Sequence, residues 1–183
     1  VAGIVGGLST GVAKAVTLVP VRVLDSCGEG TKTMVLSGLN WILADHQLGE
    51  KAVVNMSIGF ESTATSIDTA IRNLLAEGIV VVAASGNDGG SACGITPAGT
   101  LGTISVGASN ANDGEPYFTN FGECVDIFDG DNQMEGAPTT PLASGATAKF
   151  SWGLACNGKS GDDLSVLLTN GVDSLIEVTG KIA

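Results

Sequence analysis

The chain has 183 residues, of which 44% are hydrophobic, and its 19 acidic and 8 basic residues give a net charge of −11. This negative charge argues against nucleic acid or an anionic membrane as a partner. No apolar run approaches the roughly 18 residues of a membrane span, and the amino-terminal residues lack the basic region of a signal peptide. We therefore expect one soluble domain with a full core, from which any secretory leader has been removed. The 27 glycines favour a sheet with many tight turns over a helical bundle.

The first half of the chain alternates between strand and helix patterns. Residues 1–7 combine apolar and small side chains in the manner of a packed helix interior, and residues 16–24 are strand-like. Thr31 is a candidate cap for a helix over 32–47. A continuous apolar run at 52–59 predicts a buried strand.

A second helix, a third strand and two shorter strands follow. The helical period predicts a helix over 62–77 that Gly78 ends. The run 79–84 predicts a strand, and 103–108 and 124–128 predict two more. Because strands alternate with helices, we expect an α/β fold of three layers with a doubly wound, mostly parallel sheet.

The pattern changes after residue 128. Residues 129–140 are loop-like, whereas 143–155 and 162–168 favour helices. The last stretch, 172–183, is compatible with strand or coil. This part of the chain carries the least regular pattern.

Asn87 stands where the predicted strand 79–84 ends, in the run Gly86-Asn87-Asp88. Open α/β sheets bind ligands at the carboxyl ends of their strands, which makes Asn87 a candidate site residue. The alternative is an ordinary turn containing Asn-Asp-Gly.

Seven segments of the chain are Gly-Val-Ala-Lys14, Val-Arg-Val-Leu-Asp25, Val-Val-Asn-Met-Ser-Ile-Gly59, Ala-Ala-Ser-Gly-Asn87, Val-Gly-Ala-Ser109, Phe-Thr-Asn-Phe-Gly122 and Cys124-Val-Asp-Ile-Phe128. Together they are similar to the subtilisin-like serine proteases, and to the proteinase K branch in particular. They occur in the order found in that family, from residue 1 to about residue 128.

The resemblance implies a serine endopeptidase that hydrolyses peptide bonds with an Asp-His-Ser triad. In the family, the catalytic Asp and His lie upstream of the segment that resembles Val1-Ala2-Gly3. We therefore expect residues 1–183 to form one incomplete domain, which diverges over 129–183. A separate amino-terminal segment would carry the Asp and His, and the chain alone would be inactive. His46, the only histidine, is expected at a helix end and not as the general base.

The nucleophile is the third member of the triad. The best match to the family's serine motif is the run 144–148, which puts Thr147 at the nucleophile position. Ser144 or Ser151 takes that position if the register differs. A threonine without a base is a weak nucleophile. The alternative function is therefore a secreted, non-catalytic relative that binds peptides or serves a structural role.

The resemblance also implies a peptide-binding edge. Asn87 matches the oxyanion-hole asparagine of the family. An extended peptide or protein substrate would pair with one strand segment and enter a pocket between further backbone walls. The matching residues are Ser57, Ile58 and Gly59 on the pairing segment, and Ala84, Ser85, Gly86 and 96–98 in the walls. The alternative is that these segments are framework needed by the sheet.

Cysteines and a possible ion complete the expectations. Cys93 and Cys124 match a disulfide of proteinase K relatives, which argues for an extracellular protein. The states of Cys27 and Cys156 stay open. No cofactor is required.

A structural calcium ion is implied by residues that match a family site. These are Leu101 and Thr103, at carbonyl positions, and the carboxylate of Asp126. The alternative is that Asp126 only anchors a loop.

Overall fold

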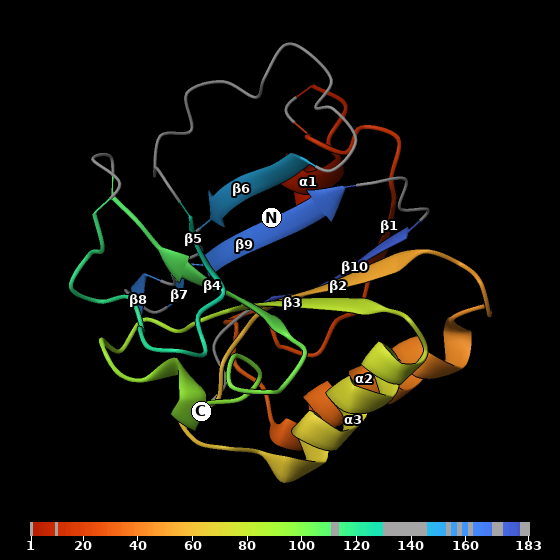
Figure 1. Ribbon diagram of the computed structural model, residues 1–183. Helices are drawn as coiled ribbons and strands as arrows, with labels where there is room; N and C mark the ends of the chain where they lie inside the picture. Colours follow the sequence, from red (N-terminus) through yellow and green to blue (C-terminus); the bar gives the residue numbers. More distant parts are fainter. Residues whose placement is uncertain are drawn as a thin grey trace.

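The computed structural model describes residues 2–9, 11–110, 114–129, 146–152, 155–156, 159–160, 163–169 and 174–179. Their centre is a six-stranded sheet in which every neighbouring pair of strands is parallel (Figure 1). Across the sheet, the strands follow the order β1 (Thr17–Pro20), β10 (Ser174–Thr179), β2 (Ala52–Ser57), β3 (Val80–Ala84), β4 (Ile104–Ala108) and β5 (Ile127–Asp129).

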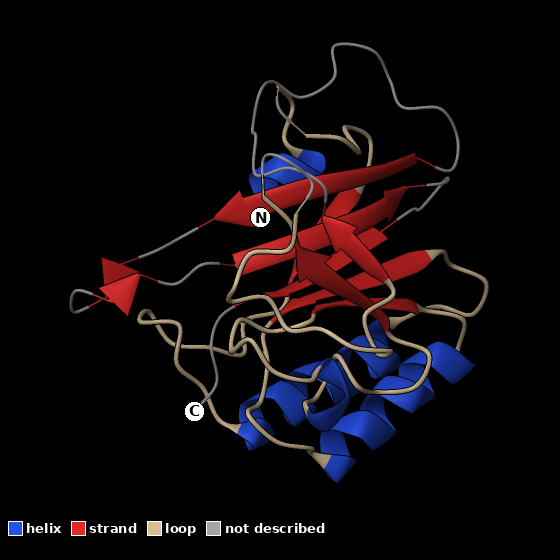
Figure 2. Ribbon diagram, turned by 60° about the vertical axis from the view of Figure 1, so that its left-hand side comes forward, coloured by secondary structure: helices blue, strands red, loops and turns tan. Residues whose placement is uncertain are grey.

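The sheet is covered on both faces, as the continuous apolar strands require. Helices α2 (Lys32–Asp45) and α3 (Thr65–Ala76) pack side by side on one face (Figure 2). Helix α1 (Ala2–Gly6) lies on the other face together with an antiparallel pair, β6 (Ala146–Trp152) and β9 (Asp163–Thr169). The expected α/β architecture with a mostly parallel sheet is confirmed.

Three short elements complete the described chain. A 3-10 turn, η1 (Ala92–Gly94), follows the loop after β3. Strands β7 (Ala155–Cys156) and β8 (Lys159–Ser160) form a separate antiparallel pair.

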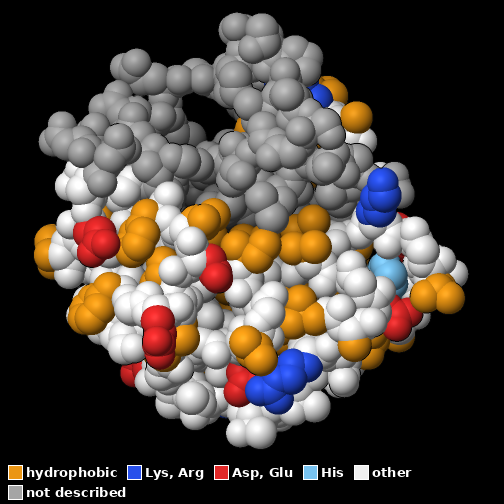
Figure 3. All heavy atoms as spheres, in the orientation of Figure 1, with side chains coloured by type: hydrophobic (Ala, Val, Ile, Leu, Met, Phe, Trp, Pro, Cys, Tyr) orange, Lys and Arg blue, Asp and Glu red, His pale blue; other side chains and the backbone are white. Residues whose placement is uncertain are grey.

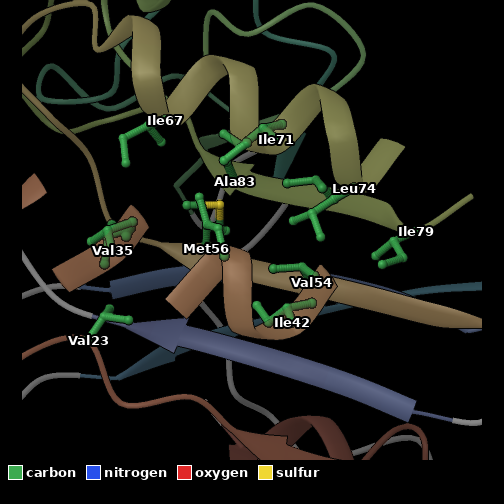
Figure 4. Close-up of a cluster of buried hydrophobic side chains, with 14 of the residues drawn as sticks. Val23, Val35, Ile42, Val54, Met56, Ile67, Ile71, Leu74, Ile79 and Ala83 are labelled. Carbon is green, nitrogen blue, oxygen red and sulfur yellow. The ribbon is translucent and has the colours of Figure 1, made fainter. Parts of the chain in front are cut away.

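The larger core cluster lies between the sheet and the two helices. Figure 4 shows side chains of α3 and α2 converging on those of β2 and β3. The cluster includes Ile67, Ile71 and Leu74 from α3, Val35, Leu39 and Ile42 from α2, and Val54, Met56, Val81 and Ala83 from the strands. A smaller cluster on the opposite face contains Val5, Val53, Val82 and Val106. Successive residues of β2 and β3 therefore supply two different cores.

The helix boundaries follow the capping residues. The side-chain oxygen of Thr31 accepts a hydrogen bond from the Met34 amide at 3.2 Å, which confirms Thr31 as the cap of α2. Helix α3 begins at Thr65, three residues later than its pattern suggests. Gly78, with φ +88°, follows that helix in the left-handed conformation that glycine adopts without strain.

The two helices expected after residue 128 are wrong where the structure describes the chain. Residues 146–152 form β6 and residues 163–169 form β9. Apolar and polar residues alternate in the first segment, as in Ala-Lys-Phe-Ser-Trp152, and in the first four residues of the second, Asp-Leu-Ser-Val166. This period of two is typical of a strand. The alanines of the first segment favour helix intrinsically, but strand pairing overrides so weak a preference.

The turn after β1 is organised by Asp25. One oxygen of its carboxylate accepts the backbone amides of Glu29, at 3.0 Å, and Cys27, at 2.8 Å. These two hydrogen bonds favour the charged carboxylate and hold the pKa of Asp25 below its ordinary value.

A disulfide between Cys93 and Cys124 joins η1 to the loop before β5. Its Cα atoms are 5.1 Å apart, and it confirms the pairing expected from the family. Cys27 is also disulfide-bonded. The side chain of Cys156 lies outside the described part of the structure.

Replacing Ile71 by alanine tests the packing of α3 on the sheet. Ile71 is fully buried, so Ile71→Ala should lower the free energy of unfolding by about 2–5 kcal/mol, measured by urea denaturation. Arg72→Ala, on the exposed side of the same helix, is the control and should change it by less than about 0.5 kcal/mol. Equal effects of the two substitutions would contradict the orientation of α3.

Removing the disulfide should destabilise the protein through the unfolded state. The bridge spans a sequence separation of 31 residues, so a Cys93→Ala/Cys124→Ala variant should lose about 3–4 kcal/mol of unfolding free energy. The double variant is preferable to a reductant because it leaves the disulfide of Cys27 in place. An unchanged denaturation midpoint would show that this link does not restrict the unfolded chain.

Candidate functional site

The carboxyl ends of β2 and β3 bring two predicted segments together. The two strands are parallel, and Met56 pairs with Ala83. The segments 57–59 and 84–86 therefore leave the sheet beside each other. Ser57, Ile58 and Ser85 are buried, and Ala84 and Gly86 are partly exposed, so the edge is built mainly from backbone and small side chains. Such an edge can offer main-chain hydrogen bonds to an extended peptide.

A third predicted segment, 96–98, closes against the first. The Phe60 amide donates to the carbonyl oxygen of Thr96 at 2.8 Å, which forms an isolated antiparallel bridge. All three residues of 96–98 are buried. The structure thus places 57–59, 84–86 and 96–98 in one region. Their role as the walls of a binding site stays a prediction.

Asp68 of α3 ties the segment 96–100 to the helix. Its carboxylate accepts the hydroxyls of Thr96, at 2.8 Å, and Thr100, at 2.6 Å. The Thr96 hydroxyl oxygen also accepts the Ala64 amide at 3.0 Å, just before the helix begins. Because Thr96 and Thr100 are buried, these bonds hold the wall in one position.

Asn87 lies on the loop that follows β3, and the residue itself is exposed. The loop is anchored to the segment 118–121 by backbone hydrogen bonds. The amides of Gly89 and Asn120 donate to the carbonyls of Phe118 and Gly86 at 2.8 and 2.9 Å. Gly86 has φ +102°, and a Cβ at this position would lie 2.8 Å from Cδ1 of Ile95, so only glycine fits without displacing a neighbour.

The side chain of Asn120 completes this anchoring. It is 1% exposed, and its Oδ1 accepts the amides of Asp88, at 3.0 Å, and Gly90, at 2.9 Å. Its Nδ2 donates to the carbonyl oxygen of Ser85 at 2.9 Å. Asn120 lies within the family segment Phe-Thr-Asn-Phe-Gly122, but its role does not follow from the sequence, because its partners lie 30 to 35 residues away in the chain.

The side chains at the predicted nucleophile positions are not among those that the structure describes. Thr147 and Ser151 lie on β6, and their side chains are outside the described part of the structure. Ser144 lies outside the described residues altogether. Their roles stay predictions.

The only histidine lies at the opposite edge of the sheet. His46 follows the last residue of α2, and the chain then runs through a short turn into the first residue of β2. One ring nitrogen of His46 is 3.1 Å from the carbonyl oxygen of Glu50. Since Asn87 lies beyond the last residue of β3, the length of that strand, about 16 Å for five residues, separates the two positions.

Asp126 is part of a short backbone and side-chain clamp. Its Oδ2 accepts the Ser105 amide at 2.8 Å, and its own amide donates to the Ser105 carbonyl at 2.9 Å. Thr103 is buried, and within the described part of the structure its hydroxyl oxygen has no hydrogen-bond partner. Among described side chains, no group of three His, Cys, Asp or Glu residues is placed to hold a metal. Any cation here would therefore depend on carbonyl oxygens as well.

Charged side chains do not gather into one patch on the face shown in Figure 3. On the face shown in Figure 3, hydrophobic side chains lie across the middle of the described surface, and acidic and basic groups are scattered singly.

Within the described residues, no helix has the length and apolar character needed to cross a membrane.

Comparisons with known proteins agree with the family suggested by the sequence segments. The Subtilase family matches residues 1–163. The "Extracellular serine proteinase" of Thermus sp. (strain Rt41A) is 45% identical over 128 residues, covering 70% of this chain and 30% of the relative. The "Alkaline serine exoprotease A" of Vibrio alginolyticus is 36% identical over 137 residues, covering 75% of this chain and 25% of the relative.

A solved structure gives the same result. The crystal structure of a cold-adapted subtilisin-like serine proteinase superposes with a TM-score of 0.66 at 34% identity, covering 73% of this chain and 48% of that one. The chain spans about a third or less of the length of the two curated relatives. Together with the parallel sheet and the loop that carries Asn87, these matches show that the chain belongs to the subtilase family.

Proposed function

We propose that this chain carries the substrate-binding edge and the oxyanion donor of a subtilisin-like serine endopeptidase. The observation that supports this most directly is the meeting of 57–59, 84–86 and 96–98 beside the exposed loop of Asn87. The substrate is an extended peptide or protein chain. Its backbone would pair with residues 57–59, and the side chain before the cleaved bond would lie between 84–86 and 96–98.

Asn87 would act on the charge that develops during hydrolysis. A nucleophilic oxygen adds to the peptide carbonyl carbon, its proton passes to a histidine base, and the carbonyl oxygen becomes negatively charged. The side-chain amide of Asn87 would donate a hydrogen bond to that oxygen. The tetrahedral intermediate then collapses with release of the amine, which takes the proton from the histidine, and water later releases the acyl group.

The catalytic Asp and His would come from residues outside this sequence. The sequence has a single histidine, and His46 lies at the far edge of the sheet from Asn87. A general base has to lie within hydrogen-bonding reach of its nucleophile, and His46 does not meet this condition for an active site at Asn87. We therefore propose that the lone chain is inactive and that a segment carrying Asp and His completes the site.

Thr147 is the proposed nucleophile position, with Ser144 or Ser151 as the alternatives.

The second candidate function is a secreted, non-catalytic relative that binds peptides or has a structural role. The strand conformation of residues 146–152 favours it, because the residue pattern predicts a helix over 143–155, which contains Thr147. The disulfide between Cys93 and Cys124 supports an extracellular location for either function.

Activity-based labelling separates these functions. The 183-residue chain should neither cleave casein nor react with a fluorophosphonate. A longer protein that contains this chain and the Asp and His should be labelled within residues 144–151. In that protein, Asn87→Ala should lower kcat by about 10²–10³ with little change in KM, which is the loss measured for this donor in subtilisin, a member of the same family.

The control is Asn73→Ala, which makes the same change on the exposed surface of α3 and should leave kcat unchanged. Casein cleavage by the lone chain would overturn the need for outside residues. If the longer protein binds peptides but is never labelled, the non-catalytic alternative replaces the proposed enzyme.

We also propose a structural calcium ion at Asp126, with Leu101 and Thr103 supplying carbonyl oxygens. The unpartnered hydroxyl of buried Thr103 and the one carboxylate oxygen of Asp126 that no described hydrogen bond uses are compatible with an oxygen-rich site. The competing role for Asp126 is the clamp on Ser105 alone.

Calcium-dependent stability distinguishes the two roles of Asp126. At a calcium concentration one hundred times its Kd, the unfolding free energy of the whole chain should exceed that in chelator by about 2.7 kcal/mol. Asp126→Asn keeps an oxygen acceptor for the Ser105 amide but loses the charge, so this increment should disappear. An equal loss of stability with and without calcium would leave Asp126 as a loop anchor only.

A further inference from the structure

The loop that carries Asn87 depends on one buried amide. The side chain of Asn120 contacts three backbone groups of this loop through hydrogen bonds, two at Oδ1 and one at Nδ2. The three groups belong to Ser85, Asp88 and Gly90, so they lie on both sides of Asn87. Asn87 lies between these groups and is exposed, so the position of its backbone depends on the hydrogen bonds of Asn120.

The chemistry of these contacts selects asparagine. One side-chain atom has to accept two amide hydrogens, and a neighbouring atom has to donate to a carbonyl oxygen, which fixes which end of the amide faces which partner. An aspartate would place a negative charge against the Ser85 carbonyl. A leucine would leave the buried Ser85 carbonyl and the partly buried amides of Asp88 and Gly90 without this partner. The backbone amide of Asn120 also donates to the carbonyl oxygen of Gly86, so both the backbone and the side chain of Asn120 fix the position of the loop.

We propose that Asn120 is a positioning residue for the oxyanion donor Asn87. This inference rests on the proposed function. Asn120 fixes the loop before substrate binds, so that the Asn87 amide already points to where the oxyanion forms. Such preorganisation lowers the energy of the transition state more than that of the bound substrate, so its loss appears in kcat and not in KM.

Amide hydrogen exchange of the 183-residue chain, followed by NMR, tests the hydrogen bonds of the Asn120 side chain and needs no catalytic activity. In Asn120→Leu, the amides of Asp88 and Gly90 should exchange at least about tenfold faster, while those of β3 and β4 keep their rates. Asn120→Asp, which keeps the acceptor but loses the donor, should fall between this variant and the wild type. Unchanged exchange at Asp88 and Gly90 would overturn the proposal.

Thr119→Val is the matched control. The hydroxyl oxygen of Thr119 accepts the Ala108 amide of β4 at 2.8 Å, so this variant also loses a buried hydrogen bond from the neighbouring residue. It should leave the exchange of Asp88 and Gly90 unchanged. Faster exchange at these two amides in the control, equal to that in Asn120→Leu, would mean that general loosening of the segment is responsible, and the specific role of Asn120 would be lost.

Kinetics in the longer, catalytically complete protein test the positioning itself. Asn120→Asp should lower kcat by about 10²-fold and leave KM within a few fold, because a small misplacement of a catalytic group has effects of this size. Thr119→Val should keep both values. Wild-type activity in Asn120→Asp would overturn the positioning role. If the unsubstituted longer protein is inactive but the exchange pattern is as expected, the proposed function is overturned, while the anchoring of the loop by Asn120 still holds.

Discussion

Burial of both faces of β2 and β3 is the constraint on which the rest of the structure depends. Val53 and Val82 supply one core, and Val54 and Val81 supply the other. Backbone N–H and C=O groups inside such a layer find hydrogen-bond partners only in neighbouring strands. The chain can therefore turn only at the ends of the strands. The loops lie at the two ends of the strands for this reason, and Asn87 is exposed at the carboxyl end, beyond the apolar run 79–84.

Much of this fold could be predicted from the sequence, because the elements from residue 16 to residue 108 are marked by local signals. The cap at Thr31 and the glycine after α3 need only neighbouring residues to be recognised. The region 146–169 could not be predicted in the same way, because its alanines and its alternating polarity favour different structures. Pairing of β6 with β9 decides between them, and that pairing is a tertiary contact.

The candidate site likewise contains residues that the sequence identifies and residues that only the structure identifies. The Asn87 loop and the disulfide cysteines follow from motifs, that is, from residue types in a known order. The roles of Asn120 and Asp68 do not, because each acts on partners 28 to 35 residues away. A buried side chain that satisfies distant backbone groups looks in the sequence like any other asparagine or aspartate. Only the packing of α3 and of the segment 118–121 shows what these two residues hold.

The place of β10 has a consequence for the order in which the sheet can assemble. It pairs with β1 on one side and β2 on the other, so these two early strands are joined through residues near the carboxyl end. Strands β2 to β5 can associate from consecutive segments, whereas β1 has to wait for a contact more than 150 residues away in sequence. Contacts of such separation form slowly. Until then, the facing edges of β1 and β2 are open to any extended strand of suitable length, which makes strand exchange the characteristic hazard of this topology.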